Sequence, residues 1–111
     1  SLAEGLFLMT PFSADDEKSA DFVAAYQDAY GEVPDQFAAD AYDAVHAISE
    51  ALKQTDLTAD SDPTEVAEKL SEAMRSITIE GLTGTLSWND QGQVEKEPAA
   101  YVIQDGKYIP A

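Results

Sequence analysis

The segment that most constrains the fold is residues 22–52, where two amphipathic helix patterns flank a short Gly-Glu-Val-Pro-Asp break. Gly31 suits the left-handed residue that ends a helix, and Pro34 prevents the first helix from continuing. Asp35 is placed to cap the second helix with its side chain. Two consecutive amphipathic helices need a partner for their apolar faces, so we expect a packed pair rather than a linker.

Each of these helices carries apolar residues at spacings of three and four, which places them on one face. In the first helix they are Phe22, Val23, Tyr26 and Tyr30. In the second helix they are Ala38, Ala41, Tyr42, Val45, Ile48 and Leu52. The alanines allow close packing against a sheet or another helix, and we expect Tyr26 and Tyr42 to be core residues.

A short strand is predicted before the helix pair. Residues 6–9 form an uninterrupted apolar run that Pro11 ends, which is typical of a strand buried on both faces of a parallel sheet. The acidic stretch 13–18 follows, and Ser13 with Asp16 predicts a capping box at the start of the helix that reaches Tyr30.

A third helix has the strongest local start signal in the chain. Asp62 is the predicted cap, Pro63 occupies the first helical position, and Glu65 is expected to reach back to the cap. The helix should run to about Arg75. Its apolar residues keep helical spacing, and they are Val66, Leu70, Ala73 and Met74.

The pattern changes to strands from Ile77 onwards. Residues 83–88 favour a strand, and residues 89–92, Asn-Asp-Gln-Gly, favour a turn. Two further strands, 99–103 and 107–109, flank an Asp-Gly pair that is typical of a two-residue hairpin. The predicted order is therefore one strand, three helices, strands and a closing hairpin, which is an α/β arrangement.

The charge of the chain excludes some partners. Its 111 residues include 22 acidic and six basic side chains, for a formal net charge of −16. Nucleic acid and anionic lipid surfaces would be repelled, so we expect neither as a partner. The chain has no cysteine, and no apolar run approaches the roughly 20 residues that span a bilayer.

No residue pattern in the chain predicts catalysis, a metal site or a cofactor. His46 is the only histidine and has no second ligand at a suitable spacing, so we expect a surface or half-buried structural role. The carboxylates of residues 15–17 and the turn at 89–93 lack the ligand spacing of a calcium loop. The serines have no neighbouring base, and no glycine-rich loop has phosphate-binding spacing.

The segments AAYQDAYG, PDQFAADAYDAVHAI and GLTGTLSWNDQGQV occur in this order, with the apolar run 5–10 before them and the segment 101–109 after them, so that the set covers nearly the whole chain. In this order and spacing the chain resembles the carboxy-terminal portion of Leu/Ile/Val-type periplasmic binding proteins, which are type 1 solute-binding proteins of ABC transporters. The resemblance implies a C-terminal fragment of a two-lobed α/β protein. Residues 1–111 would contribute to both lobes, with crossings between the lobes near 9–12 and 97–100.

The same resemblance implies the function. An amino acid, of the branched-chain type, would bind between the two lobes and be delivered to an ABC transporter permease. The protein would be periplasmic or extracellular, with a lipid anchor at a preceding N-terminal segment as an option. A swapped homodimer of this chain is a further option, since it carries pieces of both lobes.

Phe37 is the candidate ligand-binding residue. In the family an aromatic residue at its position in the PDQFAADAYDAV segment lies against the ligand side chain, where it offers a rigid apolar wall. Ordinary core packing is the alternative for Phe37. The resemblance places the groups that hold the ligand's ammonium and carboxylate outside this chain.

Two other functions remain open from the sequence. The same fold serves as the extracellular ligand-binding domain of sensory receptors. An acidic interaction domain without a small-molecule ligand is the second alternative.

Overall fold

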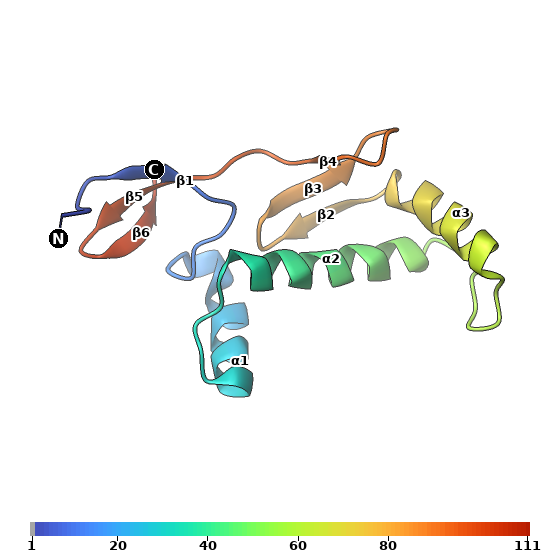
Figure 1. Ribbon diagram of the computed structural model, residues 1–111, viewed down its shortest axis with the longest axis horizontal. Helices are drawn as coiled ribbons and strands as arrows, with labels where there is room; N and C mark the ends of the chain where they lie inside the picture. The colour runs from blue at the N-terminus through green and yellow to red at the C-terminus, as the bar shows by residue number, and fades with distance from the viewer. Residues whose placement is uncertain (1) are drawn as a thin grey trace.

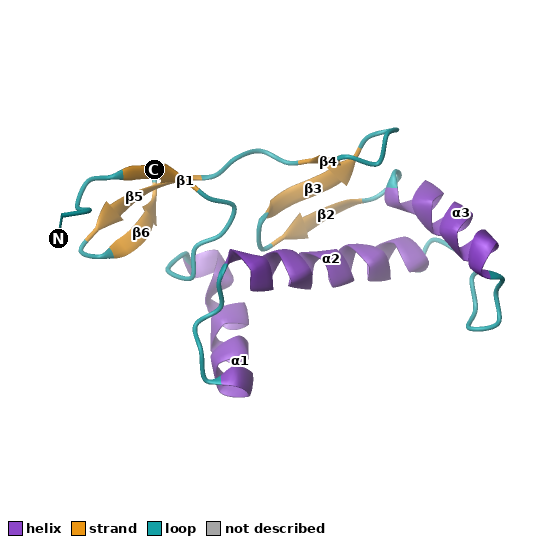
Figure 2. Ribbon diagram, viewed as in Figure 1, coloured by secondary structure: helices purple, strands orange, loops and turns teal. Residues whose placement is uncertain are grey.

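The computed structural model describes residues 2–111 and has helices and strands in the predicted order (Figures 1 and 2). The helical elements are the 3-10 helix η1 (Glu17–Ser19), α1 (Ala20–Tyr30), α2 (Gln36–Leu52) and α3 (Pro63–Met74). The strands are β1 (Phe7–Met9), β2 (Thr78–Gly81), β3 (Gly84–Trp88), β4 (Val94–Glu95), β5 (Ala100–Gln104) and β6 (Lys107–Pro110).

The strands form two separate three-stranded sheets with the orders β1-β5-β6 and β2-β3-β4, and all neighbours are antiparallel. We call the first sheet the hairpin sheet. The rest, residues 13–95, is the helical body, in which α2 runs along β2 and β3 (Figure 1). The radius of gyration is 17.1 Å, whereas a compact chain of this length has about 13 Å. The chain is therefore elongated, with two bodies side by side.

The helix ends that the sequence predicts are confirmed. Gly31 has a φ of +73° and ends α1, and its N–H donates to the Gln27 carbonyl. The Asp35 carboxylate accepts from the Ala38 N–H at 2.9 Å, and Asp62 caps α3 with Pro63 as its first residue. These ends depend on local chemistry, which is why the sequence shows them.

The capping-box prediction at residues 13–16 is wrong in its partners. Asp16 is itself the cap of η1 and accepts from the Lys18 N–H, while the Ser13 hydroxyl accepts from the Asp15 N–H. The helix up to Tyr30 therefore begins with a 3-10 turn. At α3, the Glu65 carboxylate pairs with Lys69 at 2.8 Å.

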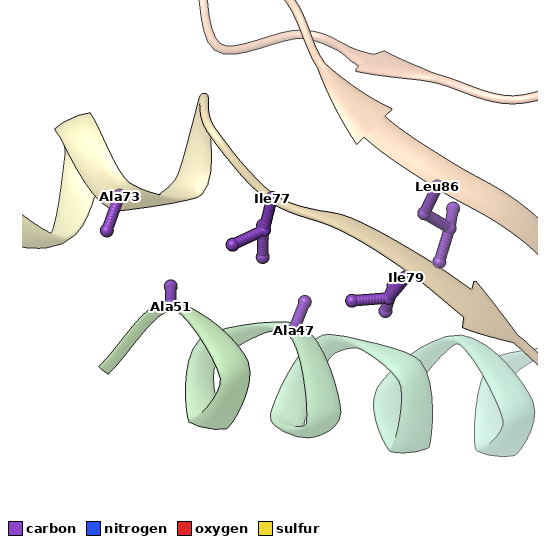
Figure 3. Close-up of a cluster of buried hydrophobic side chains, with 6 residues drawn as sticks. All are labelled: Ala47, Ala51, Ala73, Ile77, Ile79 and Leu86. Carbon is purple, nitrogen blue, oxygen red and sulfur yellow. The ribbon is translucent and has the colours of Figure 1, made fainter. Parts of the chain in front are cut away.

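The main core lies where α2 and α3 meet the strands of the helical body. Its buried side chains are Ala47, Ala51, Ala73, Ile77, Ile79 and Leu86 (Figure 3). The alanines of α2 point at the isoleucines that enter and form β2, so the helix approaches the strand closely. Small side chains on one partner and branched ones on the other give close packing without voids.

The predicted apolar stripe of α2 is not the buried one. Tyr42, Val45, Ile48 and Leu52 are exposed, with Tyr42 at 54%, and the buried residues of α2 are Ala39, Asp43, Ala47 and Ala51. Helix α2 carries two apolar faces, one large and one small. The small face meets the sheet because only short side chains let the Asp43 carboxylate reach the turn between β2 and β3.

Aromatic side chains join α1 to α2. The Phe22 ring contacts Tyr42 at 5.1 Å and Tyr26 at 5.8 Å between centroids, and Phe12 meets Phe22 edge-on at 6.1 Å. Tyr26 is half-buried and Tyr42 is exposed, so the prediction that both are core residues is wrong. Phe12, which is 4% exposed, is the buried member of this group.

Strand β1 also differs from expectation. It pairs antiparallel with β5, with Leu8 opposite Tyr101, and Phe7 and Met9 are each 62% exposed. The prediction of a parallel strand buried on both faces is therefore wrong for the described residues. An apolar run predicts an apolar strand, but it does not predict whether the neighbouring strand runs parallel or antiparallel to it.

The two predicted reversals are confirmed. The Asn89 side chain accepts from the N–H groups of Gln91 and Gln93, which holds the turn between β3 and β4. Asp105 and Gly106 have φ angles of +52° and +77°. Positive φ at both central residues is the backbone of the tight hairpin turn that Asp-Gly favours.

Asp43 connects α2 to the β2–β3 turn. It is 2% exposed, and its carboxylate accepts from the N–H groups of Leu82 and Thr83 at 2.8 Å each and from the Thr83 hydroxyl at 2.7 Å. The fit excludes a side chain at Gly81, whose Cβ would lie 2.5 Å from an Asp43 oxygen. A buried carboxylate needs such donors to offset its lost hydration.

We expect Asp43→Asn to destabilise the protein by about 2 kcal/mol, because the amide offers one acceptor where the carboxylate offers two and leaves a buried donor unpaired. Urea denaturation followed by circular dichroism measures this change. Asp28→Asn makes the same chemical change on the exposed face of α1 and should be silent. Equal stability of the two variants would contradict this role of Asp43.

Candidate functional site

The junction between the two bodies is where residues distant in sequence meet. The chain passes between the bodies at residues 10–12 and again at residues 96–99, drawn in Figure 1 as the thin connections from β1 towards η1 and from β4 to β5. The Thr10 N–H donates to the Ala99 carbonyl at 3.1 Å and so continues the β1–β5 ladder, which places the two passages side by side where they leave the hairpin sheet. The junction is therefore a paired crossing, not a single flexible link.

Each passage is fastened to α2. The Thr10 hydroxyl lies 3.3 Å from the Gln36 amide oxygen, in the first turn of α2. Lys96 lies with its ammonium 3.5 Å from an Asp40 oxygen and 3.4 Å from the Thr83 hydroxyl. A displacement of either passage would therefore be transmitted through these contacts to the N-terminal half of α2.

A cavity of about 370 Å³ lies at this junction. Its walls come from β1, the loop before η1, the start of α2 and the β5–β6 hairpin, and the lining residues are Leu8, Thr10, Phe12, Ser13, Ala14, Asp15, Pro34, Asp35, Gln36, Gly106 and Tyr108. Both bodies contribute to it. The volume falls in the range of small-molecule sites, and the walls mix apolar side chains with a few polar groups.

Several polar groups of the cavity already have partners. The Asp15 carboxylate accepts from the Tyr108 N–H at 3.1 Å, and the Ser13 hydroxyl donates to the Tyr108 carbonyl at 3.5 Å. The Asp35 carboxylate caps α2. These bonds hold the walls in place: Ser13 and Asp15 join the two bodies, and Asp35 fixes the start of α2.

A phenol and a carboxylate form the buried side of the junction. Tyr101 of β5 is 1% exposed, and its hydroxyl donates to Asp16 Oδ2 at 3.3 Å. Burial raises the pKa of the Tyr101 phenol above its ordinary value, and the charge of Asp16 adds to this effect. The hydroxyl is therefore a neutral donor throughout the physiological range.

Phe37 lies in the first turn of α2, next in sequence to Gln36 of the cavity wall. Its side chain is 70% exposed, so it packs into no core within residues 2–111. The Asp35 cap and the Thr10–Gln36 contact fix the backbone on which it is carried. Phe37 is thus a large apolar side chain held at a fixed place beside the junction.

The sequence considerations about His46, metal sites and membrane spans can be compared with the structure. His46 is exposed, with its ring 3.8 Å from a Glu50 oxygen on the next turn of α2. Among the residues that the structure describes, no group of three His, Cys, Asp or Glu side chains could hold a metal ion. Within the same residues, no helix has the length and apolar character needed to cross a membrane.

Sequence reasoning missed Asp43 and the residues that join the two bodies. The signal for Asp43 was present, because it interrupts the row Ala39, Ala47 and Ala51 at a spacing of four. The contacts of Asp15 and Asp16 had no such signal, since their partners lie 85 or more residues further along the chain. Acidic residues before a helix are ordinarily explained by the helix dipole alone.

Helices and strands of this order and pairing define a portion of a two-lobed α/β ligand-binding fold. The model of the periplasmic binding protein family matches residues 1–107, so the chain belongs to this family. A comparison with curated proteins found no match.

Three solved structures show how specific the likeness is. A substrate-binding protein of an ABC transporter from Desulfitobacterium hafniense, in complex with Leu, is 28% identical over 98% of this chain and 32% of its own, with a TM-score of 0.72. A putative branched-chain amino acid ABC transporter protein from Rhodospirillum rubrum is 26% identical over 98% of this chain and 31% of its own, with a TM-score of 0.77.

The third is a solute-binding protein of an ABC transporter from Rhodopseudomonas palustris, in complex with 3,4-dihydroxybenzoic acid. It is 27% identical over 96% of this chain and 29% of its own, with a TM-score of 0.75. This chain thus spans about a third of the length of these structures. Relatives of the chain are solute-binding proteins, and the family is periplasmic or extracellular.

We expect the stability of the protein to fall as the pH rises above about 10, the pKa of an unfolded tyrosine, because the folded Tyr101 keeps its proton to a higher pH. The contribution is complete below pH 10 and is lost as Tyr101 ionises in the folded state. The stability of the Tyr101→Phe variant should change less with pH than that of the parent between pH 9 and pH 11, a window that extends on the order of one pH unit to each side of that pKa. Urea midpoints across this range measure the difference, and parallel curves would contradict it.

Proposed function

We propose that this chain is the C-terminal part of a solute-binding protein that carries an amino acid, of the branched-chain type, to the permease of an ABC importer. The observation that carries the proposal is the paired crossing between two bodies in a chain of this family. Neighbours bound to Leu and named for branched-chain amino acids support the class of solute. No catalytic step is part of this function.

The two bodies would belong to the two lobes of the longer protein, with residues 9–12 and 97–100 as the crossings. A solute held between lobes binds the closed arrangement better than the open one, and this difference drives closure. The junction fits such a motion because short extended passages bend more easily than packed helices. The hydrogen bond between Thr10 and Ala99 would keep the passages together while they bend.

Phe37 would supply an apolar wall to the solute's side chain. Its exposure leaves it free to contact a ligand, and the capped first turn of α2 fixes its position. A rigid ring suits a branched aliphatic group, because little conformational entropy is lost on binding. Groups for the solute's ammonium and carboxylate would come from the part of the protein outside this chain.

A sensory ligand-binding domain is the second candidate, since the same fold and the same solute would serve it. Transport of labelled solute in cells with and without the longer protein separates the two functions. An acidic interaction domain without a small ligand is the third, and it predicts no response to any solute.

We place the protein in the periplasm or outside the cell, with a lipid anchor as an open option. The comparisons give no support to a swapped dimer of this chain.

The first test is a thermal-shift screen of the longer protein that contains this chain, against amino acids, small amides and aromatic acids. At one hundred times its dissociation constant a true ligand adds about 2.7 kcal/mol of stability. We expect a selective shift with leucine, isoleucine or valine. No shift with any compound of the panel would reject the proposal.

Phe37→Ala should weaken binding of that solute by roughly tenfold to a hundredfold, which corresponds to about 1.4–2.8 kcal/mol of lost apolar contact. Isothermal titration calorimetry measures it. Val33→Ala, at an exposed apolar residue before α2, is the matched control and should bind normally. Unchanged affinity of Phe37→Ala would remove Phe37 from the site.

The 111-residue chain by itself should not bind free amino acids with the affinity of the longer protein. Enclosing a zwitterion without paired charges costs several kcal/mol, and those charges are proposed to lie outside the chain. Calorimetry of the isolated chain against the solute found above tests this. Tight, saturable binding would show that the chain holds a complete site.

A further inference from the structure

The hydrogen bonds that join the two bodies concentrate at one place beside the paired crossing. They connect Ser13, Asp15 and Asp16 of the loop before α1 with Tyr101 and Tyr108 of the β5–β6 hairpin. Each bond spans between 85 and 95 positions of sequence, so none of them stabilises a helix, a strand or a local turn. We call these five residues the clasp.

Three of the five clasp residues are tied to a helix or a strand of their own body. Tyr101 and Tyr108 lie on paired strands, β5 and β6, with Tyr101 almost fully buried. On the other body, the second oxygen of Asp16 caps η1, which leads directly into α1. A displacement of the hairpin sheet would therefore be transmitted to the helix axis through these bonds.

The position of the clasp sets what it can control. The passages meet where Thr10 bonds to Ala99, and this bond is a point about which the bodies could turn. Three clasp residues, Ser13, Asp15 and Tyr108, line the junction cavity together with Thr10, so the clasp is a second attachment beside that point. One point of attachment leaves the two bodies free to rotate about it, whereas a second attachment beside it restricts that rotation.

We propose that the clasp is a positioning device that restricts the angle between the two bodies before any solute arrives, and so preorganises the protein for closure. This proposal rests on the proposed function, because it assumes that the two bodies belong to lobes that close. A protein whose two bodies are already restricted relative to each other loses less conformational freedom on closure, which raises affinity without a new contact to the solute. None of the clasp residues needs to touch the solute.

The test measures the angle directly, in the longer protein. Spin labels are attached at Ser71→Cys on α3 and Gln104→Cys on β5, both exposed positions in a chain without cysteine. Pulsed electron-spin resonance then gives the distribution of distances between the labels. Tyr101→Phe removes one hydroxyl from the clasp, and Asp15→Ala removes the acceptor of the Tyr108 N–H.

Each variant has a matched control within the chain. Tyr26→Phe removes a hydroxyl from the half-buried tyrosine of α1, and Asp90→Ala removes an exposed carboxylate in the β3–β4 turn. Urea denaturation shows whether each variant is folded. Asp15 is exposed, so its variant keeps the test valid if the Tyr101 variant proves unstable.

Without solute, we expect both clasp variants to broaden the label distances and both controls to match the parent. Solute affinity should then fall by roughly threefold to tenfold in the clasp variants. Distance distributions as narrow as those of the controls would overturn the proposal. Broad distributions in a protein that binds no solute would support the clasp and reject the carrier function, so the two proposals can fail separately.

Discussion

The buried carboxylate of Asp43 is the interaction on which the helical body depends. It accepts three hydrogen bonds from the turn between β2 and β3, and this requirement determines which face of α2 meets the sheet. The alanines on that face follow from it, because longer side chains would hold the helix too far away for the carboxylate to reach. Gly81 follows as well, since any side chain there would collide with Asp43. One polar contact thus fixes the composition of an apolar interface.

Because the small face of α2 meets the sheet, its larger apolar face stays largely exposed within this chain, apart from the contact of Phe22 with Tyr42. Tyr42, Val45 and Ile48 are exposed there, as are Phe7 and Met9 on β1. Exposed apolar surface of this extent is unusual for a self-contained globular domain. It agrees with a chain that matches only about a third of the length of its solved relatives. The elongated shape has the same origin, because two bodies that share a crossing do not by themselves enclose a common core.

The sequence predicted those parts of the fold that depend on neighbouring residues. Gly31, Asp35 and the Asp62-Pro63 pair mark helix ends through their own backbone and side-chain chemistry, and Asp105-Gly106 marks a hairpin in the same way. The family was also visible, in the order of several such segments. The sequence did not predict contacts between segments that lie far apart along the chain. The buried face of α2 depends on residues some 40 positions away, and the partner of β1 lies at the other end of the chain.

The candidate site also has a part that the sequence predicted and a part that depends on contacts between distant segments. Phe37 is proposed only through the resemblance, because an exposed aromatic residue in a first helical turn has no local signature of binding. The junction itself was expected only as two crossings. That they lie side by side, fastened to α2 and joined by acidic residues, depends on contacts between segments that no local pattern connects. Acidic side chains in particular are so common in this chain that composition cannot distinguish the two, Asp15 and Asp16, that have a specific partner across the junction.

The pairing of β1 with β5 has a consequence for the order of folding. Phe7 lies opposite Val102, so forming this ladder closes a loop of some 90 residues, at an entropic cost of roughly 4 kcal/mol before any contact is gained. The helices and the β2–β3 hairpin close far shorter loops and can form earlier. During synthesis β1 is made before β5, so the edge of β1 that pairs with β5 stays unpaired until β5 has left the ribosome. The β1–β5 ladder is thus among the last of these contacts to form, and during that interval the apolar, unpaired edge of β1 is open to aggregation or to binding by a chaperone.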